Sequence, residues 1–316
     1  MQYSILGKTG LRVSRLAFGC SSLGDPRKQV SDEESLRAVK AAIDGGINLI
    51  DVSPYYGATR AEQIVGQAIG DTPRDQVILA TKAGRNGEHD FDFSAVGLRR
   101  SVEQSLKRLG TDYIDILQLH DIEYADRDLI FKESLPTLQK LKVEGKTRFV
   151  GVTAYPIETL VAVIESTQVD TVLSYCRYCL NDTALETLRP VAEQAGIGLI
   201  NASPLAMGLL SEQGPFPWHP ASAKIRETCQ AAVAYAQQHG ERIEKLAIQF
   251  VLQADWVPTT VVGAANADQV RQSITWMNES IDRALLDEVH QIVIPNDSRA
   301  WHCGKQEKGS ETSSGS

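Results

Sequence analysis

Four titratable side chains of complementary chemistry stand near the ends of apolar segments in the first half of the chain. Asp51, Lys82 and His120 each end a short apolar run, and Tyr56 lies in the loop after Asp51. A tyrosine titrates near pH ~10, but a lysine ammonium beside it favours tyrosinate and lowers its pKa. A carboxylate keeps that lysine charged, and a histidine can orient a substrate oxygen through a hydrogen bond. Together these residue types could move a proton on and off a substrate oxygen.

Each of these residues taken singly has an ordinary structural explanation. Asp51 could cap a turn, Tyr56 could be a packing residue, Lys82 could be solvated and His120 could bond a backbone carbonyl. Four ionisable groups at the ends of neighbouring segments are harder to explain in this way, because a packed core tolerates few of them. The set contains no activated nucleophile, so we expect hydride transfer as the partner chemistry, which requires a nicotinamide cofactor.

The elements that must position these residues alternate regularly along the chain. Predicted strands cover 15–18, 47–52, 77–81, 113–119, 149–153, 171–175, 198–201 and 259–262. Predicted helices cover 32–44, 61–69, 94–109, 128–143, 157–166, 183–194, 222–239, 267–277 and 282–292. Such alternation indicates a parallel sheet with right-handed crossovers, and the segment over 18–24 lacks the G-x-G-x-x-G fingerprint of an open dinucleotide-binding sheet. We therefore predict an α/β fold, a (β/α)8 TIM barrel with an N-terminal β-hairpin over 3–13 and an extra C-terminal helix and loop.

Local signals set the ends of these elements. The helix over 32–44 begins with Ser31 as N-cap and Glu34 at the capping-box position, and it stops at Gly45 and Gly46. The predicted strand over 198–201 is followed by a long Gly/Pro loop before the helix over 222–239. No linker divides the chain, so we expect one domain over 1–304 and a disordered Gly/Ser-rich tail over 305–316.

Composition excludes several classes of function. The formal charge is −8 and the pI is near 5.4, which argues against nucleic acid or an anionic membrane as partner. No apolar stretch approaches the ~18 residues of a membrane span, and the N-terminus lacks signal-peptide character. Five cysteines are too few and odd in number for a disulfide framework, so we expect a cytoplasmic protein. We interpret the C-x-x-C over 176–179 as packing and expect no metal site.

The segments around the four side chains resemble the aldo-keto reductase family. The matching motifs are GGINLID over 45–51, YYG over 55–57, LATK over 79–82 and DILQLH over 115–120, and the resemblance covers essentially the whole chain. It implies a nicotinamide-dependent oxidoreductase. Within it, Tyr56 would be the general acid/base, Lys82 and Asp51 the pair that tunes it, and His120 the residue that positions the substrate.

The same resemblance implies a set of cofactor-binding residues. These are Gly19, Cys20, Ser21, Thr153, Tyr175, Ser203, Pro204, Leu205, Ala206, Gly263, Ala264, Ala265, Asn266 and Gln269. Members that prefer the phosphorylated cofactor usually carry Lys or Arg around the last of these positions. This chain has Gly263 and Gln269 at those positions. Without a cation, a 2′-phosphate loses a charge-assisted hydrogen bond of about 1.5–3 kcal/mol. We therefore expect NAD, with NADP as the alternative through the nearby Arg271.

Three positions depart from the family pattern. Thr153 and Ala154 replace the Ser-Asn pair that usually holds the carboxamide, so Thr153 would act alone. Tyr175 stands where a glutamine is common, and Ala202 stands where an aromatic ring often stacks on the nicotinamide.

Further segments are similar to family members that oxidise C1 of an aldose with NAD to a lactone. They cover 120–123, 173–178, 200–210 and 217–221. The resemblance implies a small-molecule sugar as substrate, with L-galactose first and L-fucose second. The expected substrate contacts are His120, Asp121, Tyr56, His89 and Trp301, the last from a C-terminal loop over the mouth. We expect a monomer or a weak homodimer.

Three other functions remain compatible with these residues. One is an NADPH-linked reductase of aldehydes and ketones, and another is a pyridoxal dehydrogenase. The third, from a different class, is a non-catalytic nucleotide-binding regulatory subunit, since such subunits keep the same four residues. Repeated NADH production from an aldose would separate the first expectation from all three.

Overall fold

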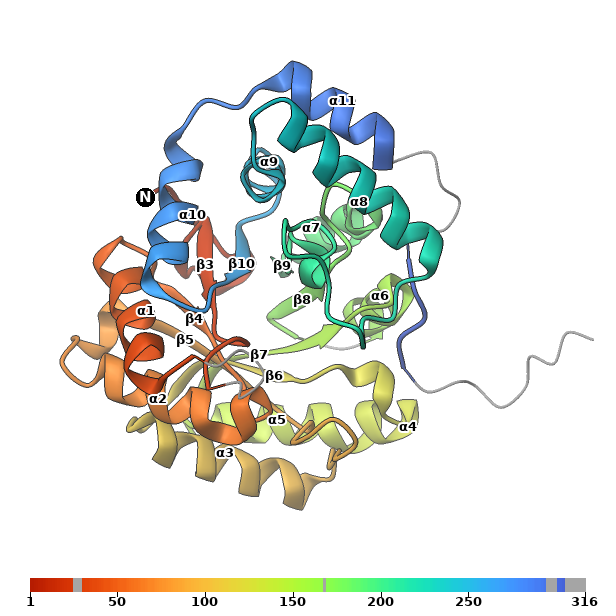
Figure 1. The fold of residues 1–316 in the computed structure, drawn as a ribbon. Helices are drawn as coiled ribbons and strands as arrows, with labels where there is room; N and C mark the ends of the chain where they lie inside the picture. Colours follow the sequence, from red (N-terminus) through yellow and green to blue (C-terminus); the bar gives the residue numbers. More distant parts are fainter. Residues whose placement is uncertain (25–29, 167–168, 294–299, 305–316) are drawn as a thin grey trace, which may run out of the picture.

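A computed structural model describes residues 1–24, 30–166, 169–293 and 300–304 of the chain. Its centre is a closed barrel in which all neighbouring strands run parallel, in the order β10-β3-β4-β5-β6-β7-β8-β9 (Figure 1). The strands are β3 (Leu16–Gly19), β4 (Leu49–Asp51), β5 (Ile78–Ala83), β6 (Ile114–Leu119), β7 (Thr147–Ala154), β8 (Thr171–Tyr175), β9 (Gly198–Ala202) and β10 (Thr259–Gly263). The prediction of a (β/α)8 barrel is confirmed. The predicted tail over 305–316 lies outside the described residues.

Helices surround the barrel, and most of them bury their apolar faces against it. They are α1 (Asp32–Asp44), α2 (Arg60–Ile69), α3 (Ala95–Leu109), α4 (Arg127–Leu129), α5 (Leu135–Val143), α6 (Ile157–Ser166), α7 (Arg189–Ala195), α8 (Ala223–Gln238), α9 (Ile243–Leu252), α10 (Ala267–Asn278) and α11 (Arg283–Val293). The predicted capping box at the start of α1 is present, because Ser31 accepts the Glu34 N–H and the Glu34 side chain accepts the Ser31 N–H. This reciprocal pair satisfies two donors that a helix start leaves free.

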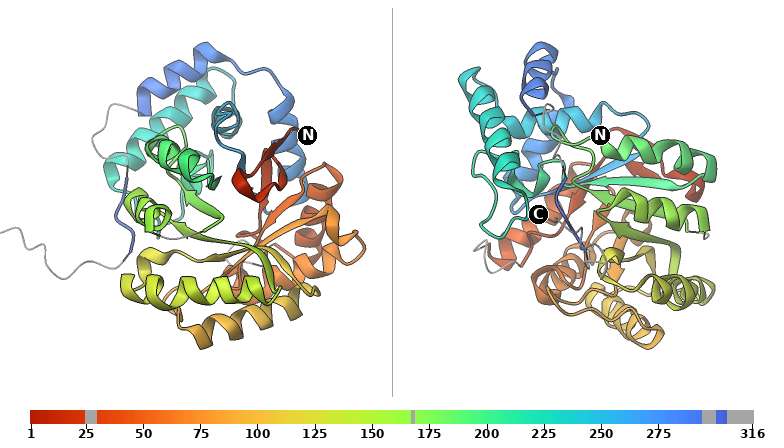
Figure 2. Two further views of the ribbon diagram at one scale, coloured as in Figure 1. Left: turned by 180° about the vertical axis from the view of Figure 1, so that it is seen from behind. Right: turned by 90° about the vertical axis from the view of Figure 1, so that its right-hand side faces the viewer.

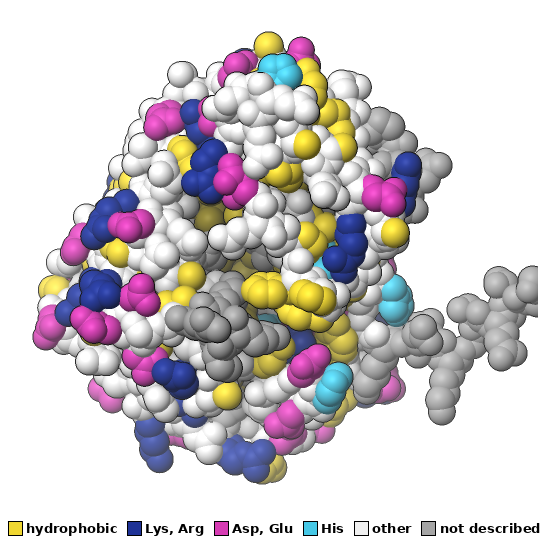
Figure 3. All heavy atoms as spheres, viewed as in Figure 1, with side chains coloured by type: hydrophobic (Ala, Val, Ile, Leu, Met, Phe, Trp, Pro, Cys, Tyr) yellow, Lys and Arg dark blue, Asp and Glu magenta, His cyan; other side chains and the backbone are white. Residues whose placement is uncertain are grey.

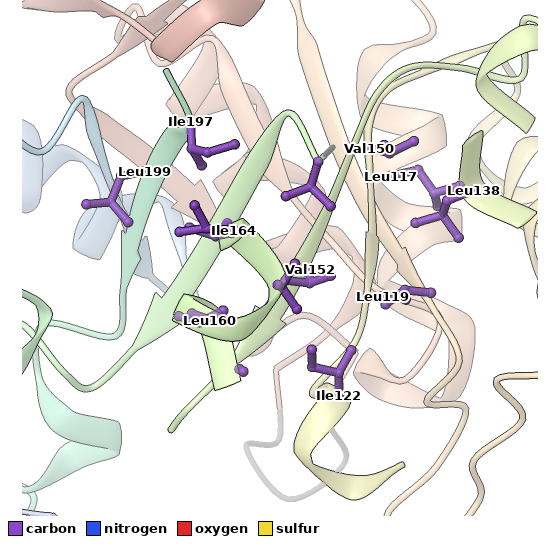
Figure 4. Close-up of a cluster of buried hydrophobic side chains, with 14 of the residues drawn as sticks. Leu117, Leu119, Ile122, Leu138, Val150, Val152, Leu160, Ile164, Ile197 and Leu199 are labelled. Carbon is purple, nitrogen blue, oxygen red and sulfur yellow. The ribbon is translucent and has the colours of Figure 1, made fainter. Parts of the chain in front are cut away.

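The core forms layers inside and outside the barrel wall. Inside, Leu49, Ile116, Ile200 and Val261 belong to one buried cluster. Outside, strand residues that point the other way pack against the helices, as Leu117, Val150 and Val152 do near α5 and α6 (Figure 4). Successive side chains of a strand alternate between faces, so both layers come from the same short segments.

The predicted N-terminal hairpin crosses the amino end of the barrel. Its strands β1 (Tyr3–Ile5) and β2 (Arg12–Ser14) pair antiparallel. The turn between them touches the start of β9, where the Lys8 N–H donates to the Gly196 carbonyl at 2.7 Å. Fully buried Leu6 joins the interior cluster. The hairpin therefore covers this end (Figure 2, left), and any site open to a ligand must lie at the opposite, carboxyl end of the strands.

One pairing of helix and strand in the prediction was wrong. The predicted helix over 222–239 is present as α8, but α8 packs against α11 outside the barrel rather than covering β9. The barrel position belongs to α9, which the analysis of the sequence missed and which contacts β10 and α10. Both α8 and α9 have apolar residues at helical spacing, so only the packing shows which of them is the extra one.

Two further helices differ in detail from the prediction. The segment predicted as a helix over 183–194 is a 3-10 turn (Ala184–Leu188) followed by α7, in which Pro190 occupies the first turn. The segment predicted over 128–143 is α4 and α5 joined by a π-helical stretch (Ile130–Ser134). Neither change moves the strand ends.

Candidate active site

The four predicted side chains meet at the carboxyl end of the barrel. Asp51 is the last residue of β4, Lys82 lies near the end of β5, and His120 follows β6. The Lys82 Nζ donates to Asp51 Oδ1 at 2.5 Å and to the Val52 carbonyl at 3.0 Å. It also lies 4.9 Å from the centroid of the Tyr56 ring, and the Tyr56 and His120 rings meet edge to face at 5.7 Å. The sequence order of the strands therefore places all four groups around one point.

Tyr56 differs from the other three in exposure. Asp51, Lys82 and His120 are 4%, 2% and 3% exposed, whereas Tyr56 is only partly buried. On the face of Figure 1, which is opposite the hairpin, a hollow opens near the middle of the molecule (Figure 3). Tyr56 is thus the residue of the four with the most exposed surface.

The pKa of Tyr56 corrects one expectation. Burial raises the pKa of Tyr56 to about 12, and the opposing effect of the Lys82 ammonium does not overcome it. The prediction that the lysine brings the phenol below its usual pKa is therefore wrong for the ligand-free protein, although the direction of the lysine's own effect was right. The cause is desolvation, which penalises the charged form of any buried group. Burial also disfavours the charged form of Lys82, but Asp51 and Tyr56 together outweigh it and raise the pKa of the ammonium.

His120 is a neutral imidazole. Burial lowers its pKa to about 3, and the cations Lys82 and Arg85 act in the same direction, against Asp121. The fully buried Ser53 lies with its Oγ 3.0 Å from Nδ1. That hydroxyl oxygen accepts the Tyr55 N–H at 3.1 Å and can donate its own proton to Nδ1. In the tautomer in which it does so, the ring proton lies on Nε2, which can donate to a substrate oxygen. Ser53 was not among the site residues predicted from the sequence.

Arg85 is a second site residue that was not predicted from the sequence. It follows β5 by two residues, and its Nη1 lies 2.5 Å from Asp121 Oδ2. The guanidinium carbon also lies 4.4 Å from the centroid of the Tyr55 ring. The available signal was the position of Arg85 three residues after Lys82, just beyond the end of the same strand. The predicted substrate residue Asp121 is thus brought beside His120 with a cation as its partner.

Thr153 and Tyr175, predicted to contact the cofactor, bind carboxylates of the β6 loop. The Thr153 hydroxyl donates to Asp121 Oδ1 and accepts the Asp121 N–H, both at 2.8 Å. Its single proton is therefore engaged, and only acceptor capacity is left for a carboxamide. The Tyr175 hydroxyl donates to Glu123 Oε1 at 2.9 Å. Burial raises the pKa of the Glu123 carboxyl to about 8, and the nearby Asp121 acts in the same direction.

The other predicted cofactor residues lie along the same rim, at the ends of β3, β9 and β10. Gly19 and Gly263 are register partners, and a Cβ on Gly263 would lie 3.7 Å from the Ser21 Oγ. Cys20 is fully buried, and its N–H donates to the Asp51 carbonyl at 2.9 Å. Among the residues of the loop after β9, Ser203 and Ala206 adopt left-handed backbone with φ of 58° and 48°. Pro204 and Leu205 lie between them.

The start of α10 completes this rim. After Ala264 and Ala265, the Asn266 Oδ1 accepts the Gln269 N–H at 3.0 Å, and the Gln269 Oε1 accepts the Ala265 N–H at 2.8 Å. The side-chain amides of Asn266 and Gln269 can therefore offer a ligand uncharged N–H donors. The nearby Arg271 is paired with Asp268 at 2.9 Å.

Trp301 and His89, predicted to contact the substrate, have different surroundings. Trp301 is 7% exposed, stacks on Tyr155 at 5.0 Å and meets His219 edge to face at 4.9 Å. The Nε2 of His219 lies 3.1 Å from the Ala206 carbonyl, so the C-terminal segment contacts the loop after β9 through this pair. His89 is exposed in the loop closed by the bridge between Arg85 and Phe91, and the structure does not bring it to the four side chains.

Two general features of the described residues bear on the class of protein. None of their helices combines the length and the apolar character needed to cross a membrane. Over the same ranges, no three His, Cys, Asp or Glu side chains gather as a metal site would. Cys176 and Cys179 are buried free thiols, and burial raises the pKa of each.

Comparison with known proteins defines the class. The model of the aldo/keto reductase family matches residues 15–294, and the chain belongs to that family. It is an oxidoreductase of the aldo-keto reductase type. A solved aldo-keto reductase from Bacillus halodurans, in its holo form, superposes with a TM-score of 0.76 at 26% identity, covering 95% of this chain and 100% of that one.

Among individual relatives, the chain is similar to sugar dehydrogenases. It is 43% identical to L-galactose dehydrogenase of Arabidopsis thaliana, over 95% of this chain and 96% of the relative. It is 33% identical to D-arabinose 1-dehydrogenase of Saccharomyces cerevisiae, over 83% and 82% of the two chains. D-threo-aldose 1-dehydrogenase of a Pseudomonas species is 29% identical, over 89% and 94%. The predicted resemblance to the family is confirmed.

Proposed function

We propose that this protein is an NAD-dependent aldose 1-dehydrogenase that oxidises C1 of a sugar to the lactone. L-galactose is the first substrate expected and L-fucose the second. The observation that carries the proposal is the placement of Tyr56 beside the Lys82–Asp51 ion pair and edge to face with His120. The identity of 43% to an L-galactose dehydrogenase over 95% of the chain supports the choice of sugar.

The four side chains have separate parts in the proposed reaction. The His120 Nε2–H donates to O1 of the sugar and holds it near the phenol. Tyr56, as tyrosinate, takes the proton from O1 while the carbon–oxygen double bond of the lactone forms at C1. Lys82 stabilises the tyrosinate, and Asp51 keeps Lys82 protonated. A bound nicotinamide supplies the acceptor for the hydride that leaves C1.

The donor groups on the rim favour NAD over NADP. The loop from Ser203 to Ala206 would hold the pyrophosphate, and Asn266 with Gln269 would face the ribose of the adenosine. Their amide N–H groups suit neutral hydroxyls, whereas a 2′-phosphate needs a cation for a strong contact. Arg271 already has an ion-pair partner in Asp268, and both side chains are largely exposed, at 66% and 93%. A 2′-phosphate on NADP would compete with Asp268 for Arg271.

A steady-state assay tests the proposal against its alternatives. NADH formation is measured with L-galactose, L-fucose and other L- and D-aldoses, with pyridoxal and simple aldehydes and alcohols for comparison, and with NAD and NADP at fixed substrate. We expect many turnovers per enzyme with at least one aldose and NAD. A larger kcat/KM for pyridoxal or a simple aldehyde would contradict the sugar assignment. Absence of turnover with intact NADH binding would favour a regulatory subunit.

The variant Tyr56→Phe tests the role of the phenol. We expect it to bind NADH as the wild type does and to lose most of its turnover, because the ring stays and only the proton acceptor is removed. Tyr235→Phe is the matched control, since the Tyr235 hydroxyl bonds Glu288 at an exposed site on α8. Full activity in Tyr56→Phe would end the proposal.

A further inference from the structure

Arg85 and Asp121 form a buried ion pair beside His120 that the proposed proton transfer does not use. The two side chains are 14% and 8% exposed, and the Arg85 Nη1 lies 2.5 Å from Asp121 Oδ2. Besides Tyr55, the rings of Phe91 and Tyr124 lie 5.4 and 5.2 Å from the guanidinium carbon. A guanidinium held by three aromatic faces and one carboxylate has little freedom to move.

Asp121 is held from the opposite side as well. Thr153 bonds both its Oδ1 and its backbone N–H at 2.8 Å. The backbone of Asp121 is left-handed, with φ of 55°, a conformation that is uncommon for residues other than glycine. With these contacts in place, the Asp121 Oδ2 that binds Arg85 also lies 3.7 Å from His120 Nε2. A carboxylate oxygen has two acceptor positions, and Arg85 takes one of them.

The result is a donor and an acceptor side by side at the point where the substrate would react. The Nε2–H of His120 donates, and the second lone pair of Asp121 Oδ2 accepts. Two oxygens on neighbouring carbons lie roughly one hydrogen-bond length apart, so a vicinal diol can contact both groups at once. In an aldose these oxygens are O1 and the hydroxyl oxygen on C2.

We propose that Asp121 accepts a hydrogen bond from the C2 hydroxyl of the sugar and that Arg85 is the positioning residue that holds Asp121 for this contact. The inference rests on the proposed function and specifies how that site distinguishes a sugar from a simple aldehyde. A substrate without the hydroxyl leaves the second acceptor position of the buried Asp121 Oδ2 without a donor. Hydrogen bonds to charged groups correspond to a preference of about 10- to 100-fold in kcat/KM.

The test deletes the hydroxyl and the carboxylate in turn. kcat/KM with NAD is measured for L-galactose and for 2-deoxy-L-galactose in the wild type and in Asp121→Asn. Removing the hydroxyl also changes the intrinsic reactivity of C1, but that change is the same in every variant and cancels when their ratios are compared. We expect a ratio of about 10 to 100 in the wild type and about three or less in Asp121→Asn.

Arg85 is tested with two substitutions and a matched control. Arg85→Met should lower the ratio as Asp121→Asn does, and Arg85→Lys should retain part of it, because it keeps the charge and loses the fixed geometry of the guanidinium. Arg99→Met should keep the wild-type ratio, since Arg99 makes a two-bond contact with Glu144, at 2.8 and 2.7 Å, on the outside of the barrel. Asp121→Asn keeps the size of the side chain, so the outcome does not depend on the folding of Arg85→Met.

The outcomes separate this inference from the proposed function. A wild type that oxidises both sugars equally well overturns the inference alone. So does an Asp121→Asn variant that binds NADH normally and loses activity on both sugars by the same factor, because a merely structural role would give that pattern. A wild type that oxidises neither these two sugars nor any other aldose of the panel overturns the proposed function, and the inference with it.

Discussion

Replacement of Lys82 by methionine removes the cation on which the electrostatics of the site depend. Lys82 is 2% exposed and pairs with Asp51, whose other carboxylate oxygen has only a long contact, 3.4 Å, with the Gln118 Nε2. The variant therefore leaves a buried carboxylate with one weak donor. Removing one partner of a buried ion pair destabilises a protein by about 3–5 kcal/mol.

A second substitution separates stability from activity. In the double variant Lys82→Met with Asp51→Asn, no unpaired charge remains, so we expect a free energy of unfolding within about 1 kcal/mol of the wild type. Turnover should stay low in both variants, by about 10²- to 10⁴-fold, because neither has an ammonium to stabilise the tyrosinate. Stability is measured by denaturant unfolding, and turnover by NADH formation from the best aldose.

The control for this prediction is Lys132→Met. Lys132 pairs with Asp128 at 2.7 Å, but both side chains are about three-quarters exposed, at 74% and 75%. Such a pair contributes at most about 1 kcal/mol. The reasoning would be refuted if Lys82→Met were no less stable than this control, or if the double variant recovered turnover along with stability.

Four other predictions follow from single sites. Because the pKa of Tyr56 is about 12 in the ligand-free protein, the fraction of tyrosinate, and hence kcat/KM for oxidation, should rise without a plateau from about pH 7 to 10. A value of kcat/KM that is independent of pH over this range would contradict Tyr56 as the base. Ser53→Ala removes the hydroxyl that contacts the Nδ1 of His120. We expect kcat, measured by steady-state kinetics, to fall by about tenfold and NADH binding, measured by titration, to stay unchanged. Glu123 has a folded-state pKa of about 8, above its unfolded value. Its contribution to stability is therefore present at low pH and is lost as pH rises from about 4 to 8. The stability of Glu123→Gln relative to the wild type should increase across that range, and a constant difference would contradict the raised pKa. Ser31→Ala should lower the free energy of unfolding by about 1 kcal/mol through loss of the cap on α1, with kcat unchanged.

Much of the fold and of the site could be predicted because the signals are local. The Ser31 capping box, the glycines at helix ends and the short apolar runs specify elements that the structure contains, and residues at the carboxyl ends of parallel strands must share one rim. The gathering of Asp51, Lys82 and His120 follows from that rule alone. The pairing of α9 rather than α8 with the barrel was not predictable in this way, since both have an apolar face and only their tertiary contacts differ.

The sequence by itself determined the barrel, its family and the identity of the four groups at its mouth, because strand and helix periodicity and the order of motifs are written in neighbouring residues. Only the tertiary structure decided the environment of each group. Ser53 and Arg85 act on His120 and Asp121 across different loops, and no spacing along the chain reports such a contact. The balance between burial and charge at Tyr56 depends on how much water the fold excludes, a property of the packed protein.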